Sequence, residues 1–362
     1  MLSKRNKRSR RSKRNKRICV TVASNKPIDE NRNIRHTAKQ RVFTVRLVLA
    51  AVWFAVNMTG CSIDPENQPV ARTEILSDIQ FVCDKAIESS KEQIKSREPV
   101  YVIDLDSYVA PRPDFSKYDD AFDNYVDPTI EVHYYSENMY NSIFHFMDVK
   151  IKHPSQLRLA LAGNSYGATR DYPSSISKTV NAVAAVSGSF YNARPYGVVI
   201  YNRNLLKKVP KNLDVLLIDS EGELHIVNDR EIESSGVLEN YDIIHAISFG
   251  PELVKDGEEL TVTKPDWQPN RNDSRTAICT FEDKLHYLIC IVEAGKPTSK
   301  GIYMQTFAHE LAAKGVKSAY NLDGGQTGTM VIGNRLKNRV SWGPQKKQGE
   351  ILYFATGIDT ES

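Results

Sequence analysis

The strongest chemical signal in the chain is the segment 319–331, AYNLDGGQTGTMV, in which a short apolar run ends in a carboxylate and two glycines. A strand here would deliver Asp323 into a tight turn, where glycines adopt positive φ and let the backbone approach a ligand closely. Hydroxyls and backbone N–H groups beyond the turn could hold an anionic oxygen. The same Asp-Gly-Gly pattern also fits an ordinary hairpin turn, and spacing alone does not separate the two interpretations. The candidate residues of this segment are Asn321, Asp323, Gly324, Gly325, Thr327 and Thr329.

The elements that would position this turn are mostly strands. The segment 304–314, ending at Gly315, has the pattern of a helix, and 316–322 would be the strand that leads to Asp323. A further short helix is predicted at 154–162, where Pro154 and Ser155 would begin it. Strands are predicted at 140–152, 197–201, 213–219, 224–227, 276–281 and 285–292, the last two forming a hairpin. The predicted fold class is α+β, with a mostly antiparallel or mixed sheet and a few packed helices.

Three of the five cysteines lie beyond residue 63, and none belongs to a CxxC or Cys/His cluster typical of zinc sites. Cys279 and Cys290 lie in the two arms of the predicted hairpin, so a disulfide is one interpretation. Burial as small hydrophobic side chains is the other, and it is favoured.

Charge is distributed unevenly along the chain. Residues 1–46 carry 16 of the 48 Lys and Arg residues but only two of the 44 acidic ones. The rest of the chain is therefore acidic, although the whole chain has a formal net charge of +4. Because polyphosphate binding needs a positive surface, no nucleic-acid partner is expected for the folded body.

An uncharged apolar run, 47–56, follows this basic tail. It is shorter than the roughly 20 residues of a membrane span and has the length of a signal h-region. The Met-Thr-Gly-Cys sequence that ends at Cys61 resembles a bacterial lipobox, so Cys61 is a candidate lipidation site. The alternative is an uncleaved signal anchor. In both cases the body is expected outside the cytoplasm, tethered to the membrane in a bacterial cell envelope.

These features predict four parts. Residues 1–46 are a basic cytoplasmic tail, and 47–63 are the signal or anchor segment. Residues 64–130 are a spacer, with an amphipathic helix at 71–97 and an aperiodic linker rich in Asp, Pro and Tyr at 107–128. Residues 131–358 form the functional domain.

Several ordered motifs of this domain resemble the phosphodiester glycosidase family, which includes exported bacterial proteins related to exopolysaccharides. Residues 319–330 are similar to the family's NLDGGGSSTM, and the helix and strand before them occur in the same order. Arg275-Thr276-Ala277 is similar to the family's R-T-A, and Phe249-Gly250-Pro251 to its F-G-P. The resemblance extends over roughly residues 133–355.

The resemblance implies a hydrolase that cleaves a sugar-1-phosphate diester at the glycosidic carbon–oxygen bond, in a phosphorylated glycan or exopolysaccharide. Stabilising charge on phosphate and on an oxocarbenium-like sugar should dominate. In this interpretation Arg275 is a catalytic phosphate clamp, because a guanidinium can bind two phosphate oxygens. Asp323 is base, nucleophile or ligand of a sugar hydroxyl. Arg194 and Ser248 are further candidate substrate-binding residues, a surface position and a turn cap being the alternatives.

The chain also departs from the family pattern. Ser187-Gly188-Ser189 stands where many bacterial members have N-G-D or N-G-G, and Gly349-Glu350-Ile351 where a Ser-Asp pair is common. If the missing Asn and Asp help to bind a sugar or a divalent metal, that function is weakened here. Whether the site uses a metal is left open by the residues. The alternative function is therefore a catalytically degenerate glycan-binding or polysaccharide-assembly protein on the same fold.

Overall fold

Most of the apolar segments of the chain form strands in the computed structural model, which describes residues 101–189, 191–262 and 271–358. The basic tail, the apolar run that leads to Cys61 and the predicted helix at 71–97 lie outside these residues. Within the described part, no helix is long and apolar enough to span a membrane.

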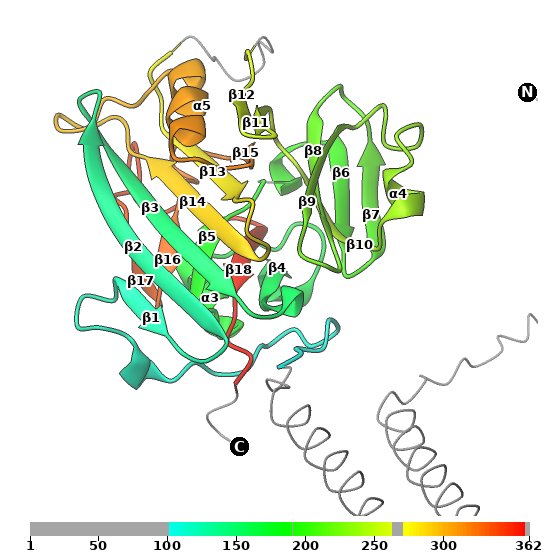
Figure 1. Ribbon diagram of the computed structural model, residues 1–362, viewed down its shortest axis with the longest axis horizontal. Helices are drawn as coiled ribbons and strands as arrows, with labels where there is room; N and C mark the ends of the chain where they lie inside the picture. The colour runs from blue at the N-terminus through cyan, green and yellow to red at the C-terminus, as the bar shows by residue number, and fades with distance from the viewer. Residues whose placement is uncertain (1–100, 190, 263–270, 359–362) are drawn as a thin grey trace, which may run out of the picture. The chain divides into compact units, whose positions relative to one another are not determined.

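Eight strands form the largest sheet, in which every pairing is antiparallel (Figure 1). In spatial order they are β1 (Asn124–Val126), β2 (Ile130–Met139), β3 (Ser142–Ile151), β14 (His286–Val292), β13 (Arg275–Thr280), β15 (Ser318–Leu322), β11 (Glu252–Lys255) and β12 (Glu258–Glu259). The predicted hairpin is confirmed as β13 and β14, with Ala277 opposite Cys290.

Two five-stranded sheets complete the fold, again with only antiparallel pairs among the described strands. The β6 sheet has the order β7 (Asn204–Val209), β6 (Gly197–Tyr201), β10 (Ile243–Ser248), β8 (Asp214–Asp219) and β9 (Leu224–Asn228). The β18 sheet has the order β17 (Arg335–Leu336), β16 (Met330–Ile332), β5 (Ala184–Ser187), β18 (Glu350–Phe354) and β4 (Leu157–Leu161). The expectation of a mostly antiparallel, sheet-rich fold is confirmed.

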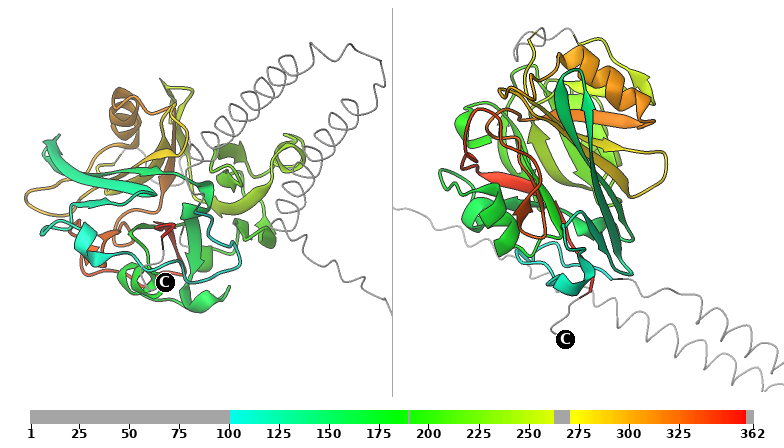
Figure 2. Two further views of the ribbon diagram at one scale, coloured as in Figure 1. Left: turned by 60° about the horizontal axis from the view of Figure 1, so that its bottom comes forward. Right: turned by 90° about the vertical axis from the view of Figure 1, so that its left-hand side faces the viewer.

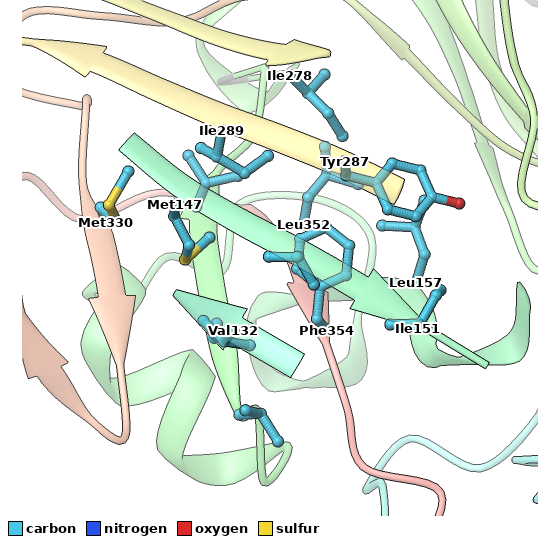
Figure 3. Close-up of a cluster of buried hydrophobic side chains, with 14 of the residues drawn as sticks. Val132, Met147, Ile151, Leu157, Ile278, Tyr287, Ile289, Met330, Leu352 and Phe354 are labelled. Carbon is cyan, nitrogen blue, oxygen red and sulfur yellow. The ribbon is translucent and has the colours of Figure 1, made fainter. Parts of the chain in front are cut away.

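The main core lies between the eight-stranded sheet and the β18 sheet (Figure 3). Alternate residues of a strand point to opposite faces of its sheet. Met147 and Val149 of β3 therefore face this core together with Leu352 and Phe354 of β18. Leu216 of β8 belongs to the same cluster, so the β6 sheet shares this core.

Helices cover the outer faces of these two sheets (Figure 2). α5 (Met304–Ala313) packs Phe307 and Leu311 on the eight-stranded sheet, in a cluster that contains Cys279 and Cys290. Both thiols are buried and free, which confirms their prediction as small hydrophobic side chains. α3 (Pro173–Thr179) covers the β18 sheet through Ile176.

The remaining helical segments are short. α4 (Val237–Asn240) is a single turn, and its Val237 packs against the β6 sheet. The 3-10 helices are η1 (Phe115–Lys117), η2 (Pro154–Gln156), η3 (Ala162–Asn164) and η4 (Tyr191–Ala193).

Two sequence interpretations change in the structure. The helix predicted at 154–162 is wrong beyond its first turn, because η2 is followed by strand β4. All five residues of β4 are buried, Arg158 included, and its run LRLAL is too short for the sequence alone to separate a strand from a helix. The segment 107–128, interpreted as a linker, packs on the body instead, since Tyr118 and Tyr125 belong to the main core.

Candidate active site

Asp323 is the first residue beyond β15, at a crossing between two sheets. β15 pairs with β13 in the eight-stranded sheet, whereas the next strand, β16, pairs with β5 in the β18 sheet. The hairpin interpretation of Asp-Gly-Gly is therefore wrong, because the chain does not fold back on β15. The turn carries Asp323 from one sheet toward the other.

The two glycines after Asp323 are needed for different reasons. A Cβ on Gly324 would lie 2.5 Å from the carbonyl oxygen of Ser274, closer than real Cβ atoms approach. Gly325 has φ +66° and open space around its Cα, so its requirement is conformational. Together they let the turn lie directly on the start of β13.

Asn321 anchors the strand end and keeps one acceptor free. Its backbone N–H donates to the carbonyl of Pro251 (3.1 Å), and its side-chain amide donates to the carbonyl of Gly250 (2.7 Å). The side chain is buried, yet Oδ1 has no hydrogen-bond partner. A buried acceptor without a partner is costly, so a hydroxyl or N–H of a ligand would be bound favourably there.

The two threonines close the loop rather than pointing to solvent. Both the backbone N–H (3.2 Å) and the hydroxyl of Thr327 donate to the carbonyl of Gly324. Thr329 joins the loop to the end of β5, because its N–H donates to the Ser187 hydroxyl (3.1 Å) and its carbonyl accepts from the Ser187 N–H (3.0 Å). The Thr329 hydroxyl is buried without a partner.

Burial raises the pKa of Asp323 to about 6. The Thr327 hydroxyl and the positive charges of Arg194 and Lys346 oppose this shift. The carboxyl group therefore exchanges its proton close to neutral pH, which suits acid, base or nucleophilic chemistry.

A cavity of about 150 Å³ opens beside this carboxyl group. It is lined by Phe249, Asp273, Ser274, Arg275, Asn321, Leu322, Asp323, Gly324 and Gly325. The Arg194 guanidinium lies 4.2 Å from the centre of the Phe249 ring. Burial lowers the pKa of Arg194, and the charge of Asp323 counteracts this. The structure thus brings Arg194 together with Asp323.

Arg275 also lines this cavity, but its guanidinium is engaged with the protein. Nε donates to the carbonyl of Ile302 (3.2 Å), and one terminal nitrogen donates to the carbonyl of Arg271 (2.8 Å). Burial lowers its pKa to about 10. Bidentate binding of phosphate by Arg275 would compete with these two hydrogen bonds. The geometry therefore favours a structural function for Arg275, which is to support the wall of the cavity.

Ser248 is not brought to the cavity by its side chain. Its hydroxyl accepts from the N–H of Val198 (2.6 Å) and donates to the carbonyl of the same residue (3.0 Å). These bonds join β10 to β6, so the side chain has a structural function at the sheet beside the site.

Glu350 is a second carboxyl group near the turn, and sequence reasoning treated it only as a departure. It is completely buried at the start of β18, and one of its oxygens accepts from the N–H (2.8 Å) and the hydroxyl of Ser189. The other oxygen has no partner, and burial raises the pKa of this group. Gly188 contacts both acids: its carbonyl accepts from the Asp323 N–H (3.4 Å), and its Cα faces the Glu350 side chain. A carboxylate in an otherwise apolar run, EILYF, was the available signal.

A sequence model of the phosphodiester glycosidase family matches residues 180–355, a range that contains Arg194, Arg275, Asp323 and Glu350. This part of the chain belongs to the phosphodiester glycosidase family. A search among curated proteins found no match.

Solved structures similar to this phosphodiester glycosidase domain include the catalytic domain of a zebrafish N-acetylglucosamine-1-phosphodiester alpha-N-acetylglucosaminidase, auto-inhibited by its pro-peptide. The two are 17% identical over 68% of this chain and 87% of that chain, with a TM-score of 0.52. A hypothetical protein from Synechocystis is 14% identical over 62% of each chain, with a TM-score of 0.45. An exported protein of Burkholderia pseudomallei is 14% identical over 59% of this chain and 74% of that one, with a TM-score of 0.42.

Sequence reasoning missed the segment 342–348 of the phosphodiester glycosidase domain, which runs along the loop after Asp323. The side-chain amide of Gln348 donates to the carbonyl of Thr327 (2.7 Å), and that of Gln326 to the carbonyl of Trp342 (3.1 Å). The positive charge of Lys346 lowers the pKa of Asp323. No local sequence pattern marks this segment, since its relation to the loop depends entirely on the fold.

Metal ligands are not gathered in the described part of the phosphodiester glycosidase domain: it holds no group of three or more His, Cys, Asp or Glu side chains. The site instead concentrates buried oxygens and hydroxyls without hydrogen-bond partners. Those near the turn are on Ser274, Thr276, Asn321, Thr329, Gln348 and Glu350. Of these residues, Ser274 and Asn321 also line the cavity beside Asp323, where their unused hydrogen-bonding capacity suits a polar ligand.

Proposed function

We propose that the domain hydrolyses a sugar-1-phosphate diester, releasing the free sugar and a phosphomonoester. The observation that carries this proposal is the position of Asp323, a carboxyl group with a pKa of about 6 beside a small polar cavity, within the family-matched segment. Such a group is ionised at neutral pH and close enough to its pKa to exchange protons.

In this reaction water adds to the anomeric carbon, and the bond from that carbon to the phosphate oxygen breaks. The Asp323 carboxylate would stabilise the positive charge that develops on the sugar, either electrostatically or by direct attack. The leaving phosphate already carries negative charge, so positive side chains rather than a strong acid are needed. Arg194 and Lys346 are the cations whose charges act on Asp323, and we assign them this role. Arg275 would hold the cavity wall in place.

We propose further that the enzyme acts on a cell-envelope glycan or exopolysaccharide and is held at the membrane by residues 47–63, through a lipid on Cys61 or an uncleaved anchor. The basic tail before the apolar run supports this orientation. Labelling cells with radioactive palmitate would distinguish the two forms of attachment, since label lost in Cys61→Ser identifies lipidation. Membrane attachment without label identifies the anchor, and a protein found free of membranes contradicts both.

The direct experiment measures free sugar release by the purified full chain from N-acetylglucosamine-1-phosphodiesters and related sugar diesters, with and without divalent cations. An Asp323→Ala protein is the matched control. Release that the control lacks supports the proposal, whereas a folded protein inactive on the whole panel contradicts it.

A binding-only protein is the alternative that such inactivity would favour. Its specific support is that the Ser187 and Ser189 hydroxyls both bond within the protein, to Thr329 and Glu350. In that case Asp323→Ala would weaken glycan binding, with no turnover to lose.

A further inference from the structure

Trp342 lies beside the loop that follows Asp323. Its carbonyl accepts a hydrogen bond from the Gln326 side chain (3.1 Å), and Gln326 lies three residues after Asp323. Three extended residues span at most about 11 Å, so the backbone of Gln326 lies within about that distance of Asp323. Lys346, whose charge acts on Asp323, lies four residues after Trp342.

The indole is held in place on one side and open on the other. Gly295 lies against its six-membered ring: a Cβ on that glycine would be 2.3 Å from Cε3 and 2.6 Å from Cδ2 and Cζ3. Yet 55% of the Trp342 surface is exposed, which makes it one of the more exposed large apolar side chains of the described residues. Ser341, directly before it, fixes the backbone because its hydroxyl accepts from the N–H of Ala294 (2.9 Å).

The backbone adds a second sign of function. Trp342 has φ +62°, the left-handed region that a bulky side chain rarely adopts. Glycine would be unstrained at this position and would expose no indole. Backbone strain of this kind gathers at ligand-binding positions, where the surrounding structure maintains it.

We propose that Trp342 is a sugar-stacking residue of the site, whose exposed indole face receives the apolar C–H face of a sugar ring in the glycan substrate. A large, rigid, amphipathic ring provides much contact area at a polar site, which is how aromatic side chains act in binding pockets. The inference rests on the proposed function for its substrate class. It adds a residue that binds the sugar without taking part in bond cleavage.

The test uses Trp342 as its own reporter. The chain has three tryptophans, so the full-length Trp53→Phe, Trp267→Phe protein keeps Trp342 as its only indole. With Asp323→Asn added to prevent turnover, the methyl diester of N-acetylglucosamine-1-phosphate should change the Trp342 emission saturably. Dimethyl phosphate, which lacks the sugar, should not change it.

Kinetics of the otherwise wild-type chain supply the second measurement. Trp342→Gly relieves the backbone strain and therefore keeps the fold, but should raise KM by about tenfold with a smaller change in kcat. Trp342→Phe should stay within about threefold of wild type, because it keeps an aromatic face. The control is Phe115→Ala, which removes another exposed aromatic side chain, 43% exposed and remote in sequence, and should leave KM unchanged.

The outcomes separate this inference from the proposed function. Normal hydrolysis with an unchanged KM in Trp342→Gly overturns the stacking role alone. A saturable emission change without hydrolysis by the wild type supports sugar stacking and contradicts the enzyme. If the wild type releases no sugar and the Trp342 emission does not change, both the stacking role and the proposed function are overturned.

Discussion

Ser189 donates both its backbone N–H and its hydroxyl to the same carboxyl oxygen of Glu350, a side chain with no exposed surface. In the sequence these residues are separate departures from the family pattern, and each suggests a weakened site. In the structure they are partners, and Gly188 beside them accepts from the Asp323 N–H. The segment Ser187-Gly188-Ser189 has no carboxyl side chain, but it binds the carboxyl group of Glu350 from β18.

This relationship predicts a pH-dependent stability difference. Burial raises the pKa of Glu350 above its value in the unfolded chain, so the fold opposes its ionisation. The penalty is absent below the unfolded pKa and develops as pH rises past it. Glu350→Gln should therefore be more stable than wild type at pH 8, with a difference that shrinks toward pH 4. Ser189→Ala should be less stable than wild type by about 1–3 kcal/mol at pH 8, because it removes the hydrogen bond from the Ser189 hydroxyl to the buried carboxyl group. Urea unfolding at both pH values measures this, and equal differences at the two would contradict it.

Removing the charge of Asp323 should stabilise the fold and reduce activity. Its pKa of about 6 in the fold exceeds the ordinary value of 3.8. Ionisation of Asp323 therefore destabilises the fold increasingly as pH rises from about 3.8 to 6, and this destabilisation is complete above pH 6. Asp323→Asn should unfold at a higher urea concentration than wild type at pH 8. Its free energy of unfolding should be larger by up to about 3 kcal/mol. Its sugar release should fall by at least about a hundredfold. A destabilised Asp323→Asn protein would show that the carboxylate instead supports the fold.

The two glycines of the turn should respond differently to alanine. Gly324→Ala places a methyl group 2.5 Å from the Ser274 carbonyl, so the backbone must move, at a cost of about 1–3 kcal/mol and a displaced Asp323. Gly325→Ala meets no atom and costs about 1 kcal/mol for its left-handed φ. Thermal unfolding and sugar release measured on both proteins check this. If Gly325→Ala loses more activity, the turn binds ligand through its conformation rather than through its contact with β13.

The sequence predicts α5, β15 and the β13–β14 hairpin because their signals are local. A helical period that stops at Gly315 and alternating apolar residues need no knowledge of the fold. Asp323 is found for the same reason, as a carboxylate between an apolar run and two glycines.

Contacts between distant segments could not be predicted in this way. Ser189 and Glu350 are 161 residues apart, and the sequence predicts β4 as part of a helix because Pro154 and Ser155 before it fit a helix start. The preference for Arg275 as phosphate clamp came from its motif, whereas the carbonyls that its guanidinium contacts become neighbours only on folding.

Arg194 and Arg275 can be distinguished by their lysine variants. Arg194 lowers the pKa of Asp323. Lysine keeps the positive charge on a shorter side chain, so a charge held farther from the carboxyl group should move the acid limb of kcat/KM above pH 6 and raise KM for the diester. Arg275→Lys cannot reproduce both charged hydrogen bonds, to the carbonyls of Ile302 and Arg271, which should reduce stability by about 1–3 kcal/mol with the acid limb unmoved. The measurements are pH–rate profiles from pH 4.5 to 9 and urea unfolding of both variants. If Arg275→Lys keeps its stability but raises KM more than Arg194→Lys, then Arg275 is the phosphate ligand and Arg194 the supporting cation.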